Sequence, residues 1–440
     1  WFLCSIFEPL TEIDNIMTKI TTAEEALKVV KSGDFVYIQG GAAVPEILVD
    51  ALVKRAPELR NVTIGHIHIE GDAPFADPKY KDSFYVNSFF LSRNVRHIIK
   101  AGNGSYTPIF LSDMPLLFDR KHIKVDVVLI QVSPPDKFGF CSMGVSVEAS
   151  KSAIRNAKYV IAKVNRQMPR TYGDALLHID EIDFLVEHDA PIFSLHLTEP
   201  NAIETQIARH IVPLIEDGST LQLGIGNIPN ATLAEMGHLK NLGIHTELLT
   251  EGVLDLVKKG VINGYEKKID KGKIIASFAM GTQELYDFID HNPSVEMTEA
   301  SYSNEVSVIR QNPKMISINS AIEVDITGQV CADSIGTTIF SGFGGQIDFV
   351  RGAMLSEGGK SIIAFPSVTN KGESKIVPFL KQGAGVVTTR AHVQYIVTEY
   401  GVAELFSKSL QERAKALIAI AHPDHREALE RAAHDIVFLH

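Results

Sequence analysis

The sequence is poor in cysteine. Its three cysteines, Cys4, Cys141 and Cys331, lie far apart and form no C-x-x-C pair. An odd, scattered set argues against a disulfide framework and against a cysteine-rich zinc site. We therefore expect a cytoplasmic protein with no bound metal.

Long hydrophobic runs and a surplus of basic residues are also missing. No apolar run reaches the roughly 18 residues that a membrane span needs, and the N-terminal WFLCSIF has no basic flank of the kind a signal peptide carries. The 42 basic residues against 53 acidic ones give a formal net charge of −11. This charge repels polyanions, so we expect no membrane or nucleic-acid partner. A local cationic pocket for one small anion stays compatible with it.

The chain does contain a repeated alternation of short β-branched runs with amphipathic stretches. Such alternation is typical of βαβ units around largely parallel sheets, so we predict an α/β fold. Its 440 residues suffice for two or three domains at about 150 residues each. The clearest expected strands are residues 35–39, 125–132, 221–225, 273–279 and 315–319.

The first folded element is expected soon after Met17. Thr22 followed by Glu25 predicts a capping box at a helix start. We interpret residues 1–16 as an upstream remnant outside the fold.

Two segments suggest an internal duplication. Residues 35–48 and 219–232 both read as strand, glycine, four residues, proline and helix, with Gly40 and Pro45 matching Gly224 and Pro229. The alternative is a chance likeness of two βα units. A duplication predicts two related open α/β domains, residues 17–195 and 196–440, with the active site in the cleft between them.

The segment G-I-G-N-I-P follows an expected strand and opens a helix. Its backbone amides, in Gly224, Ile225, Gly226, Asn227 and Ile228, can hold an anion or a developing oxyanion. The segment also resembles a dinucleotide fingerprint. Proline at position 229 replaces the third glycine of that motif, which disfavours the alternative of an NAD-dependent dehydrogenase.

A second glycine cluster occupies residues 341–353. Its three glycines within four residues, Gly342, Gly344 and Gly345, allow a tight turn and a close backbone approach to a ligand. A plain structural turn is the alternative.

His66, His68 and Glu70 alternate along an expected strand and should share one face. A row of this kind can ligate a metal, but it more often forms a hydrogen-bonded wall, so we predict no metal here. We place His66, His68 and Tyr106 in the substrate pocket, where a histidine can meet a substrate hydroxyl.

Glu247 is the candidate nucleophile. It stands at the carboxyl end of an expected strand, where open α/β sheets bind their ligands. A carboxylate attacks only an activated acceptor, and a thioester is activated without a metal. The alternative is a solvated acid at the end of a strand.

Six stretches, in order along the chain, together resemble one family: VSPPDKFGFCSMGVSV, VNRQMPRTYGD, LQLGIGNIPNATL, GIHTELLTEGVLDL, INSAIEVDITGQV and SGFGGQIDFVRGA. The sequence is similar to the acetyl-CoA hydrolase/transferase family, with its 4-hydroxybutyrate CoA-transferases as the nearest match. The resemblance runs from about residue 18 to the C-terminus.

The resemblance implies the CoA-transferase fold and a ping-pong reaction through a glutamyl-CoA thioester on Glu247. It implies acetyl-CoA and a short acid such as 4-hydroxybutyrate as substrates, no permanently bound cofactor, and a homo-oligomer. Asn304 would steady the glutamate. The resemblance places coenzyme A on residues 224–228, Gly344 and Gly345, and, with looser matches, on Asn319, Ile322, Asn370 and Lys371.

Two other functions remain open at this point. Water attacking the same intermediate would make the protein an acyl-CoA hydrolase, and sequence does not determine how far water reaches Glu247. A non-catalytic sensor of coenzyme A would tolerate replacement of Glu247, whose presence argues against that function.

Overall fold

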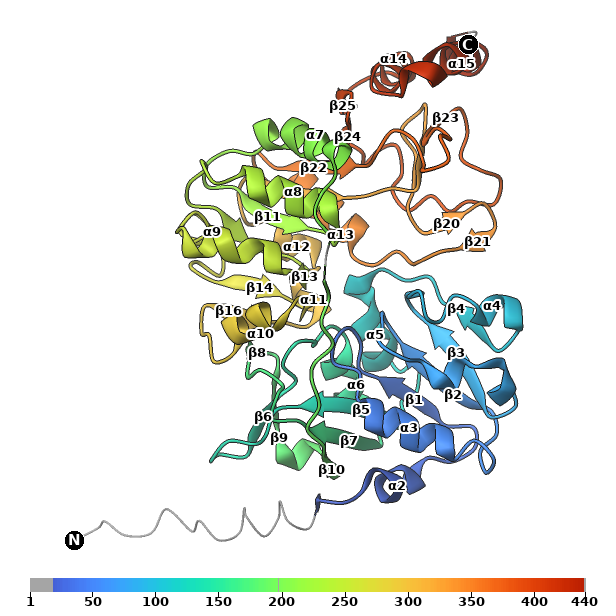
Figure 1. Cartoon of the computed structure of the whole chain (residues 1–440), viewed down its shortest axis with the longest axis vertical. Helices are drawn as coiled ribbons and strands as arrows, with labels where there is room; N and C mark the ends of the chain where they lie inside the picture. The colour runs from blue at the N-terminus through green and yellow to red at the C-terminus, as the bar shows by residue number, and fades with distance from the viewer. Residues whose placement is uncertain (1–18, 197, 439–440) are drawn as a thin grey trace, which may run out of the picture.

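The protein is described here by a computed structural model that covers residues 19–196 and 198–438. Met17 and residues 1–16 lie outside the described residues. The chain folds into two lobes that follow one another along the long axis of the molecule, each built around one large sheet (Figure 1). We refer to residues 19–195 as the N-terminal half and to residues from 196 onward as the C-terminal half.

The first sheet lies in the N-terminal half and has the order β10-β7-β5-β1-β2-β3-β4, with every pairing parallel. Its strands are β1 (Phe35–Ile38), β2 (Val62–His66), β3 (Phe84–Ser88), β4 (Gly104–Tyr106), β5 (Val127–Val132), β7 (Tyr159–Val164) and β10 (Phe184–Glu187). The helices of this half are α2 (Ala23–Ala26), α3 (Glu46–Lys54), α4 (Ile98–Ala101), α5 (Met114–Asp119) and α6 (Ser150–Asn156).

The second sheet has the order β12-β11-β17-β22-β24-β25 and is parallel except for its last pair. Its strands are β11 (Thr220–Leu223), β12 (Gly243–Ile244), β17 (Met315–Asn319), β22 (Lys360–Ala364), β24 (Tyr395–Thr398) and β25 (Gly401–Glu404). The helices are α7 (Ala202–Ile211), α8 (Asn227–Glu235), α9 (Leu254–Lys258), α10 (Gln283–Ile289), α11 (Ala300–Ser303), α12 (Val306–Ile309), α13 (Gln346–Leu355), α14 (Leu410–Ala419) and α15 (Pro423–Ala433).

The two sheets share one strand order. In the first sheet β1 lies between β2 and β5, and in the second sheet β11 lies between β12 and β17. The order β2-β1-β5-β7-β10 therefore corresponds to the order β12-β11-β17-β22-β24. The expected βα units are both present, because β1 leads to α3 and β11 leads to α8. The helix starts differ: α3 begins after Pro45, whereas α8 begins at Asn227 and contains Pro229. This common order supports the predicted duplication.

Smaller sheets connect the two halves. The strand β8 (Tyr172–Gly173) of the N-terminal half pairs with β16 (Val295–Met297), which pairs with β14 (Ile274–Ala276). The strands β13 (Leu248–Leu249) and β15 (Phe278–Ala279) pair beside them, and Ser146 bridges to Phe278. The remaining small sheets are formed by β6 (Phe140–Ser142) with β9 (Leu176–His178), β18 (Glu323–Asp325) with β19 (Val330–Cys331) and β23 (Ile376–Val377), and β20 (Ser334–Ile335) with β21 (Thr338–Ile339).

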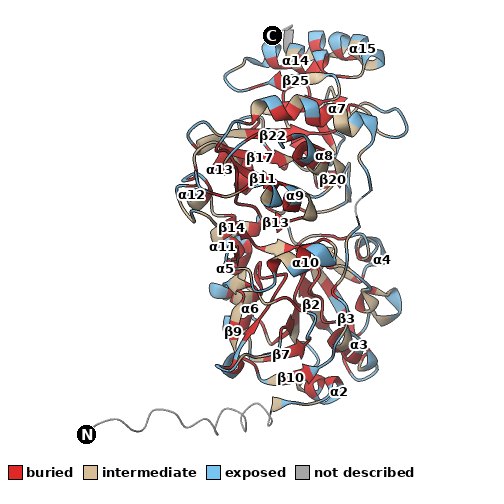
Figure 2. Ribbon diagram, turned by 60° about the vertical axis from the view of Figure 1, so that its left-hand side comes forward, coloured by how far each residue is buried: buried red, intermediate tan, exposed pale blue. Residues whose placement is uncertain are grey.

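The hydrophobic core continues across the boundary between the halves. Its largest cluster includes Tyr37 and Val128 of the first sheet together with Leu221 and Ile316 of the second. Buried residues follow the strands, while helices such as α3 and α15 expose their outer faces (Figure 2). The two halves are therefore packed as one body, although each has its own sheet.

Around the predicted domain boundary at residues 195 and 196, residues 188–196 and 198–201 contain neither helix nor strand. At the start of the fold, Thr22 caps α2 by accepting from the Glu25 amide at 3.2 Å, as predicted. The Glu25 carboxylate binds Lys28 at 2.6 Å, so the contact that would complete the capping box is replaced by an ion pair.

In the part of the chain that is described, no helix combines the length and the apolar character needed to cross a membrane.

Candidate active site

Glu247 lies between β12 and β13, beyond the carboxyl end of the second parallel sheet. Its carbonyl oxygen accepts from the amides of Ser277 at 2.8 Å and Phe278 at 2.9 Å, which fixes its backbone. This is the sheet edge at which the prediction put a ligand site. The main chain therefore holds the side chain at the junction with the N-terminal half.

Two hydrogen-bond donors face the Glu247 carboxylate. The Asn304 side chain donates from Nδ2 to Oε2 over 3.0 Å, and the backbone amide of Gly345 also donates to this carboxylate. Only glycine fits at position 345, because a Cβ atom there would stand 1.9 Å from Glu247 Oε2 and 2.1 Å from Asn304 Nδ2. The predicted Gly-rich turn is thus placed directly against the predicted nucleophile.

The orientation of the Asn304 amide is fixed by a buried neighbour. Ser303 Oγ donates to Asn304 Oδ1 over 2.8 Å, and Ser277 Oγ lies 2.5 Å from Ser303 Oγ. Because the oxygen of the amide is held by a hydroxyl, its nitrogen must face Glu247. Asn304 is fully buried, so this arrangement is shielded from competing water.

A cavity of about 160 Å³ opens in front of Glu247 and lies between the two halves. Its walls are chiefly apolar. In the described part of the chain its lining contains no lysine or arginine. The lining residues are Ile67, His68, Glu70, Phe89, Phe90, Ile109, Leu111 and Met114 from the N-terminal half, and Gly224, Ile225, Glu247, Leu248, Phe278, Met280 and Gly344 from the C-terminal half.

These surroundings change the acidity of Glu247. Burial raises the pKa of Glu247 above its ordinary value, and the hydrogen bonds from Asn304 and Gly345 offset part of that rise. A carboxylate with few donors in an apolar cavity is poorly solvated, and its charge is available to an electrophile. The site combines this carboxylate with fixed donors and a space for a small acyl group.

The 224–228 loop borders the cavity, but its members differ in position. The Gly224 amide donates to the Ile318 carbonyl over 3.1 Å, so it is already occupied. Ile225 is 46% exposed and lines the cavity, and Ile228 is buried in the core. Asn227 directs its side-chain amide to Thr198 and Glu204. Within the described residues, the amides of Ile225 and Gly226 have no protein acceptor.

The two histidines predicted for the substrate pocket, His66 and His68, lie in different surroundings. His68 lines the cavity and contacts Glu70, with 2.5 Å between Nε2 and Oε1. His66 is fully buried, packs against Phe75 and does not line the cavity. Because β2 ends at His66, the strand alternation that would align the three side chains stops there. Burial lowers the pKa of His66 to about 4, so it is a neutral core residue.

Among the described residues, no group of three or more His, Cys, Asp or Glu side chains is arranged to hold a metal ion.

Tyr106 ends β4 and supports the Gly-rich turn. Its hydroxyl accepts from the Phe343 amide over 3.2 Å, and it does not line the cavity. The structure therefore places Tyr106 beside the turn rather than in the substrate pocket.

The other predicted CoA-binding residues lie outside the cavity. Asn319 ends β17 and exchanges side-chain hydrogen bonds with Gln222 at 3.1 and 3.4 Å. The Ile322 amide donates to the Cys331 carbonyl. Asn370 and Lys371 are exposed in the turn that the Val368–Ser374 bridge closes. All four belong to the C-terminal half, and the structure does not bring them into contact with Glu247.

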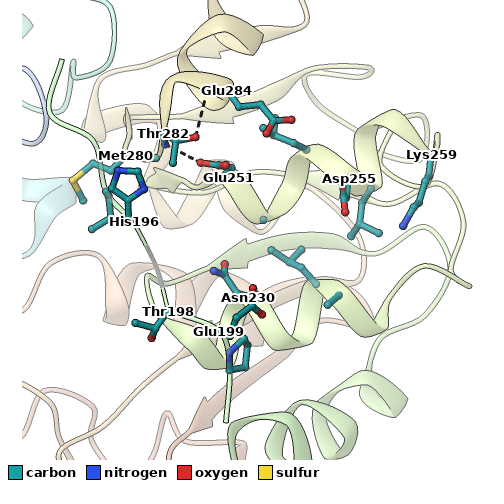
Figure 3. Close-up of a pocket in the computed structure, with 18 residues that line it drawn as sticks. His196, Thr198, Glu199, Asn230, Glu251, Asp255, Lys259, Met280, Thr282 and Glu284 are labelled. Atoms are coloured by element: carbon teal, nitrogen blue, oxygen red, sulfur yellow. Dashed lines mark hydrogen bonds between the residues drawn. The ribbon is translucent and has the colours of Figure 1, made fainter. Parts of the chain in front are cut away.

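A larger cavity, of about 480 Å³, lies between α8, α9 and the segment leading into α7 (Figure 3). It shares Met280 with the Glu247 cavity. Carboxylates predominate over cations on its walls, with Glu199, Asp255 and Glu284 exposed. Glu251 is held by the Thr282 amide at 2.8 Å. A wall of this charge repels the phosphates of a nucleotide, so the smaller cavity is the better candidate.

Two parallel sheets with a donor-held carboxylate at their junction define an α/β enzyme of the CoA-transferase type. Family models agree with this class. Residues 13–195 match the acetyl-CoA hydrolase/transferase N-terminal domain, and residues 281–433 match the C-terminal domain of the same family. The chain belongs to the acetyl-CoA hydrolase/transferase family, which confirms the resemblance seen in the sequence.

Individual relatives are also CoA-transferases. The chain is 50% identical over 420 residues to a succinyl-CoA:acetate/propanoyl-CoA:succinate CoA transferase of Fasciola hepatica, covering 94% of this chain and 87% of the relative. It is 47% identical over 412 residues to the 4-hydroxybutyrate coenzyme A transferase of Clostridium kluyveri, covering 93% and 96%. The crystal structure of a 4-hydroxybutyrate CoA-transferase from Porphyromonas gingivalis superposes with a TM-score of 0.84 at 38% identity, covering 96% and 99%.

Proposed function

We propose that the protein transfers coenzyme A from acetyl-CoA to a short carboxylic acid such as 4-hydroxybutyrate, with Glu247 as the covalent nucleophile. The observation that carries the proposal is the Glu247 carboxylate itself, which faces an apolar cavity and is held by Asn304 and Gly345. A thioester carbonyl is an acceptor that such a carboxylate attacks without a metal or a general base.

In the first step a Glu247 oxygen bonds to the acetyl carbonyl carbon. The tetrahedral intermediate then expels the CoA thiolate, and the thioester C–S bond breaks to leave an acetyl-glutamyl anhydride. No proton moves, because the leaving group departs as an anion. The amide of Ile225, which lines the cavity, and that of the adjacent Gly226 are the candidate donors for the acetyl oxyanion.

In the second step the CoA thiolate attacks the carbonyl carbon of Glu247 and acetate leaves, which gives the glutamyl-CoA thioester. The oxyanion of this step develops on Glu247 itself, where Asn304 Nδ2 and the Gly345 amide already donate. The same donors therefore stabilise the oxyanion that develops in this step. The incoming acid attacks this thioester, and the same steps in reverse regenerate the carboxylate.

The cavity favours an acid with an uncharged tail. Its ionisable lining residues are His68, Glu70 and Glu247, so a dicarboxylate would place its second charge near two acids. His68 offers a ring nitrogen to a distal hydroxyl. We therefore expect 4-hydroxybutyrate or butyrate to be a better acceptor than succinate.

Hydrolysis is the second candidate, because water attacking the same anhydride or thioester releases coenzyme A. The apolar walls formed by Phe89, Phe90 and Phe278 limit water near Glu247 and favour transfer. Release of coenzyme A from acetyl-CoA, measured with and without 4-hydroxybutyrate, separates the two. A transferase depends on the acid, whereas a hydrolase does not.

The covalent step is tested by incubating the protein with acetyl-CoA, reducing it with borohydride and mapping the modified peptide by mass. Reduction of Glu247 to the alcohol is the expected result. Glu247→Gln under the same treatment is the control and should stay unmodified. Full turnover with no modification of Glu247 would overturn the mechanism.

Several expectations from the sequence remain proposals. We place the nucleotide part of coenzyme A near Asn319, Ile322, Asn370 and Lys371, with Lys371 meeting a phosphate. We also keep a homo-oligomer, a cytoplasmic location and a domain boundary between residues 195 and 196. If Lys371→Ala lowers the affinity for CoA and leaves the affinity for a short acid unchanged, this placement of the nucleotide is supported.

A further inference from the structure

Asp348 is a buried acid directly behind the Glu247–Asn304 pair. It lies on the first turn of α13, three residues after Gly345, and is 4% exposed. The Asn304 side-chain nitrogen that donates to Glu247 Oε2 at 3.0 Å also lies 3.4 Å from Asp348 Oδ2. One amide group is thus shared by two acids of different roles.

The other side of Asp348 is held by the N-terminal half. Ser112, in the 3₁₀ turn η4 (Leu111–Asp113), donates its amide to Asp348 Oδ2 at 3.2 Å, and its Oγ lies 2.9 Å from Oδ1. The adjacent Leu111 lines the active-site cavity and donates its amide to the Gly344 carbonyl at 3.0 Å. A chain of contacts therefore runs from Ser112 through Asp348 and Asn304 to the nucleophile.

We propose that Asp348 is a positioning residue that joins the two halves behind the active site and holds the Asn304 amide against Glu247. This inference rests on the proposed function, because it assigns Asp348 a part in the reaction of Glu247. Asp348 acts through Asn304 rather than on the substrate.

Three donors meet the Asp348 carboxyl group. Oδ2 accepts from Ser112 N and Asn304 Nδ2, and Oδ1 accepts from Ser112 Oγ. Burial raises the pKa of Asp348 to about 8, and the charge of Glu247 also raises it. At neutral pH the residue is therefore mainly uncharged.

Other charged groups face the same region from several elements. Asp113 on η4, Glu305 before α12, Arg351 on α13 and His392 share a cavity wall with Asp348. Burial and the nearby Arg351 lower the pKa of His392, so it is neutral at pH 7 and above. Asp113 and Glu305 oppose ionisation of Asp348, whereas Arg351 favours it.

Ionisation of Asp348 should impair the reaction. It would put a second negative charge beside Glu247 and pull the shared Asn304 amide toward Oδ2. The neutral form dominates below the pKa of Asp348 and is lost above it, so the rate should fall as pH rises through about 8. A residue with a purely structural role would not produce this alkaline limb.

The test uses Asp348→Asn, which reproduces the neutral acid, and Asp348→Ala, which removes the bridge. We expect Asp348→Asn to keep kcat at pH 7 within about threefold and to lose the alkaline limb, and Asp348→Ala to lower kcat roughly 10- to 100-fold with KM for acetyl-CoA little changed. Asp50→Asn, the same change at an exposed position on α3 in the N-terminal half, should leave both rate and profile unchanged.

Ser112→Ala gives an independent readout. The hydrogen bonds from Ser112 lower the pKa of Asp348, so loss of the hydroxyl should move the alkaline limb to higher pH. Should Asp348→Ala fail to fold, Asp348→Asn and Ser112→Ala still decide the question. An alkaline limb that persists unchanged in both, or equal loss of kcat in the Asn and Ala variants, would overturn the inference. Borohydride trapping at Glu247 in each variant distinguishes that outcome from failure of the proposed function, in which even the wild type traps nothing.

Discussion

Glu148 in the N-terminal half and Glu247 in the C-terminal half are buried or partly buried acids beside the glycine loops of the two matching βα units. Glu148 Oε1 accepts from the Gly40 amide at 3.0 Å, and Gly40 follows β1 as Gly224 follows β11. Among the described residues, by contrast, the Glu247 carboxylate accepts hydrogen bonds from Asn304 and Gly345 alone. The same fold therefore supports two carboxylates with different numbers of partners.

The partners of Glu148 saturate its oxygens. Besides Gly40, Ser146 Oγ contacts Oε1 at 3.2 Å, and Oε2 accepts from the Ala149 amide at 2.8 Å, the Ser150 amide at 2.9 Å and Ser150 Oγ at 2.8 Å. A carboxylate whose oxygens are occupied by this many donors is a poor nucleophile. Together with the proposed mechanism, this comparison predicts that the reactivity of a carboxylate in this fold depends on how few donors it has, and not on burial alone.

The largest expected effect comes from the same change at both acids. Glu247→Gln should lower turnover at least about 1000-fold, because an amide cannot form the thioester. Glu148→Gln should lower the free energy of unfolding by about 2–4 kcal/mol, because its NH₂ group meets donors where the carboxylate accepted. Turnover assays and denaturant unfolding on both variants check the contrast.

Stability should respond oppositely at the two positions. The folded-state pKa of Glu247 is raised, so its ionisation opposes folding as pH rises through that pKa, and Glu247→Gln should be no less stable at pH 7. Equal loss of stability in both variants would show that Glu247 is also structural and would remove the distinction.

The next largest effect is expected at Gly345. Gly345→Ala puts a Cβ within 1.9 Å of Glu247 Oε2, so carboxylate and turn must separate. We expect kcat to fall about 100-fold, the range seen when a catalytic donor is displaced. Gly237→Ala, where a Cβ meets nothing within 4 Å, is the matched control. Retention of wild-type kcat in Gly345→Ala would mean that this contact is not used.

A smaller effect is expected at Asn304. Its hydrogen bond lowers the pKa of Glu247, so Asn304→Ala should raise that pKa further. Because the ionised form attacks, the acid limb of the pH–rate profile should move to higher pH, with kcat falling about tenfold. Asn156→Ala removes an amide donor to Asp119 on the surface and should leave the profile unchanged. An unshifted acid limb in Asn304→Ala would show that the Asn304 hydrogen bond does not control the pKa of Glu247.

The sequence was informative where a local pattern reports a backbone requirement. Strand runs such as 315–319 match the observed strand, and Gly345 marks the close approach that the turn needs. The placement of Glu247 followed from the end of a parallel strand. Asp348 stood in the same motif as Gly345, but its contact with Ser112, 236 residues earlier, has no sequence signal.

His66 shows why the remaining site residues were harder to predict. The pattern of alternate residues assumed that the strand continues past position 66, whereas β2 ends there and His66 turns into the core. The lining residues Phe90 and Met114 are likewise set by how two sheets pack, which no local spacing reports. Contacts between the halves were therefore the part of the site that sequence alone did not reveal.

The smallest effect is expected on the wall supplied by the N-terminal half. His68 lines the cavity beside Phe90 and offers a ring nitrogen toward it. His68→Phe keeps a ring of similar size and removes the hydrogen-bonding nitrogen. It should lower kcat/KM for 4-hydroxybutyrate relative to butyrate by about 3- to 10-fold, the value of one hydrogen bond. Competition between the two acids measures this ratio directly. A ratio that does not change would show that His68 of the N-terminal half does not determine the choice between the two acids, and would assign that choice to the C-terminal half, which also carries Glu247.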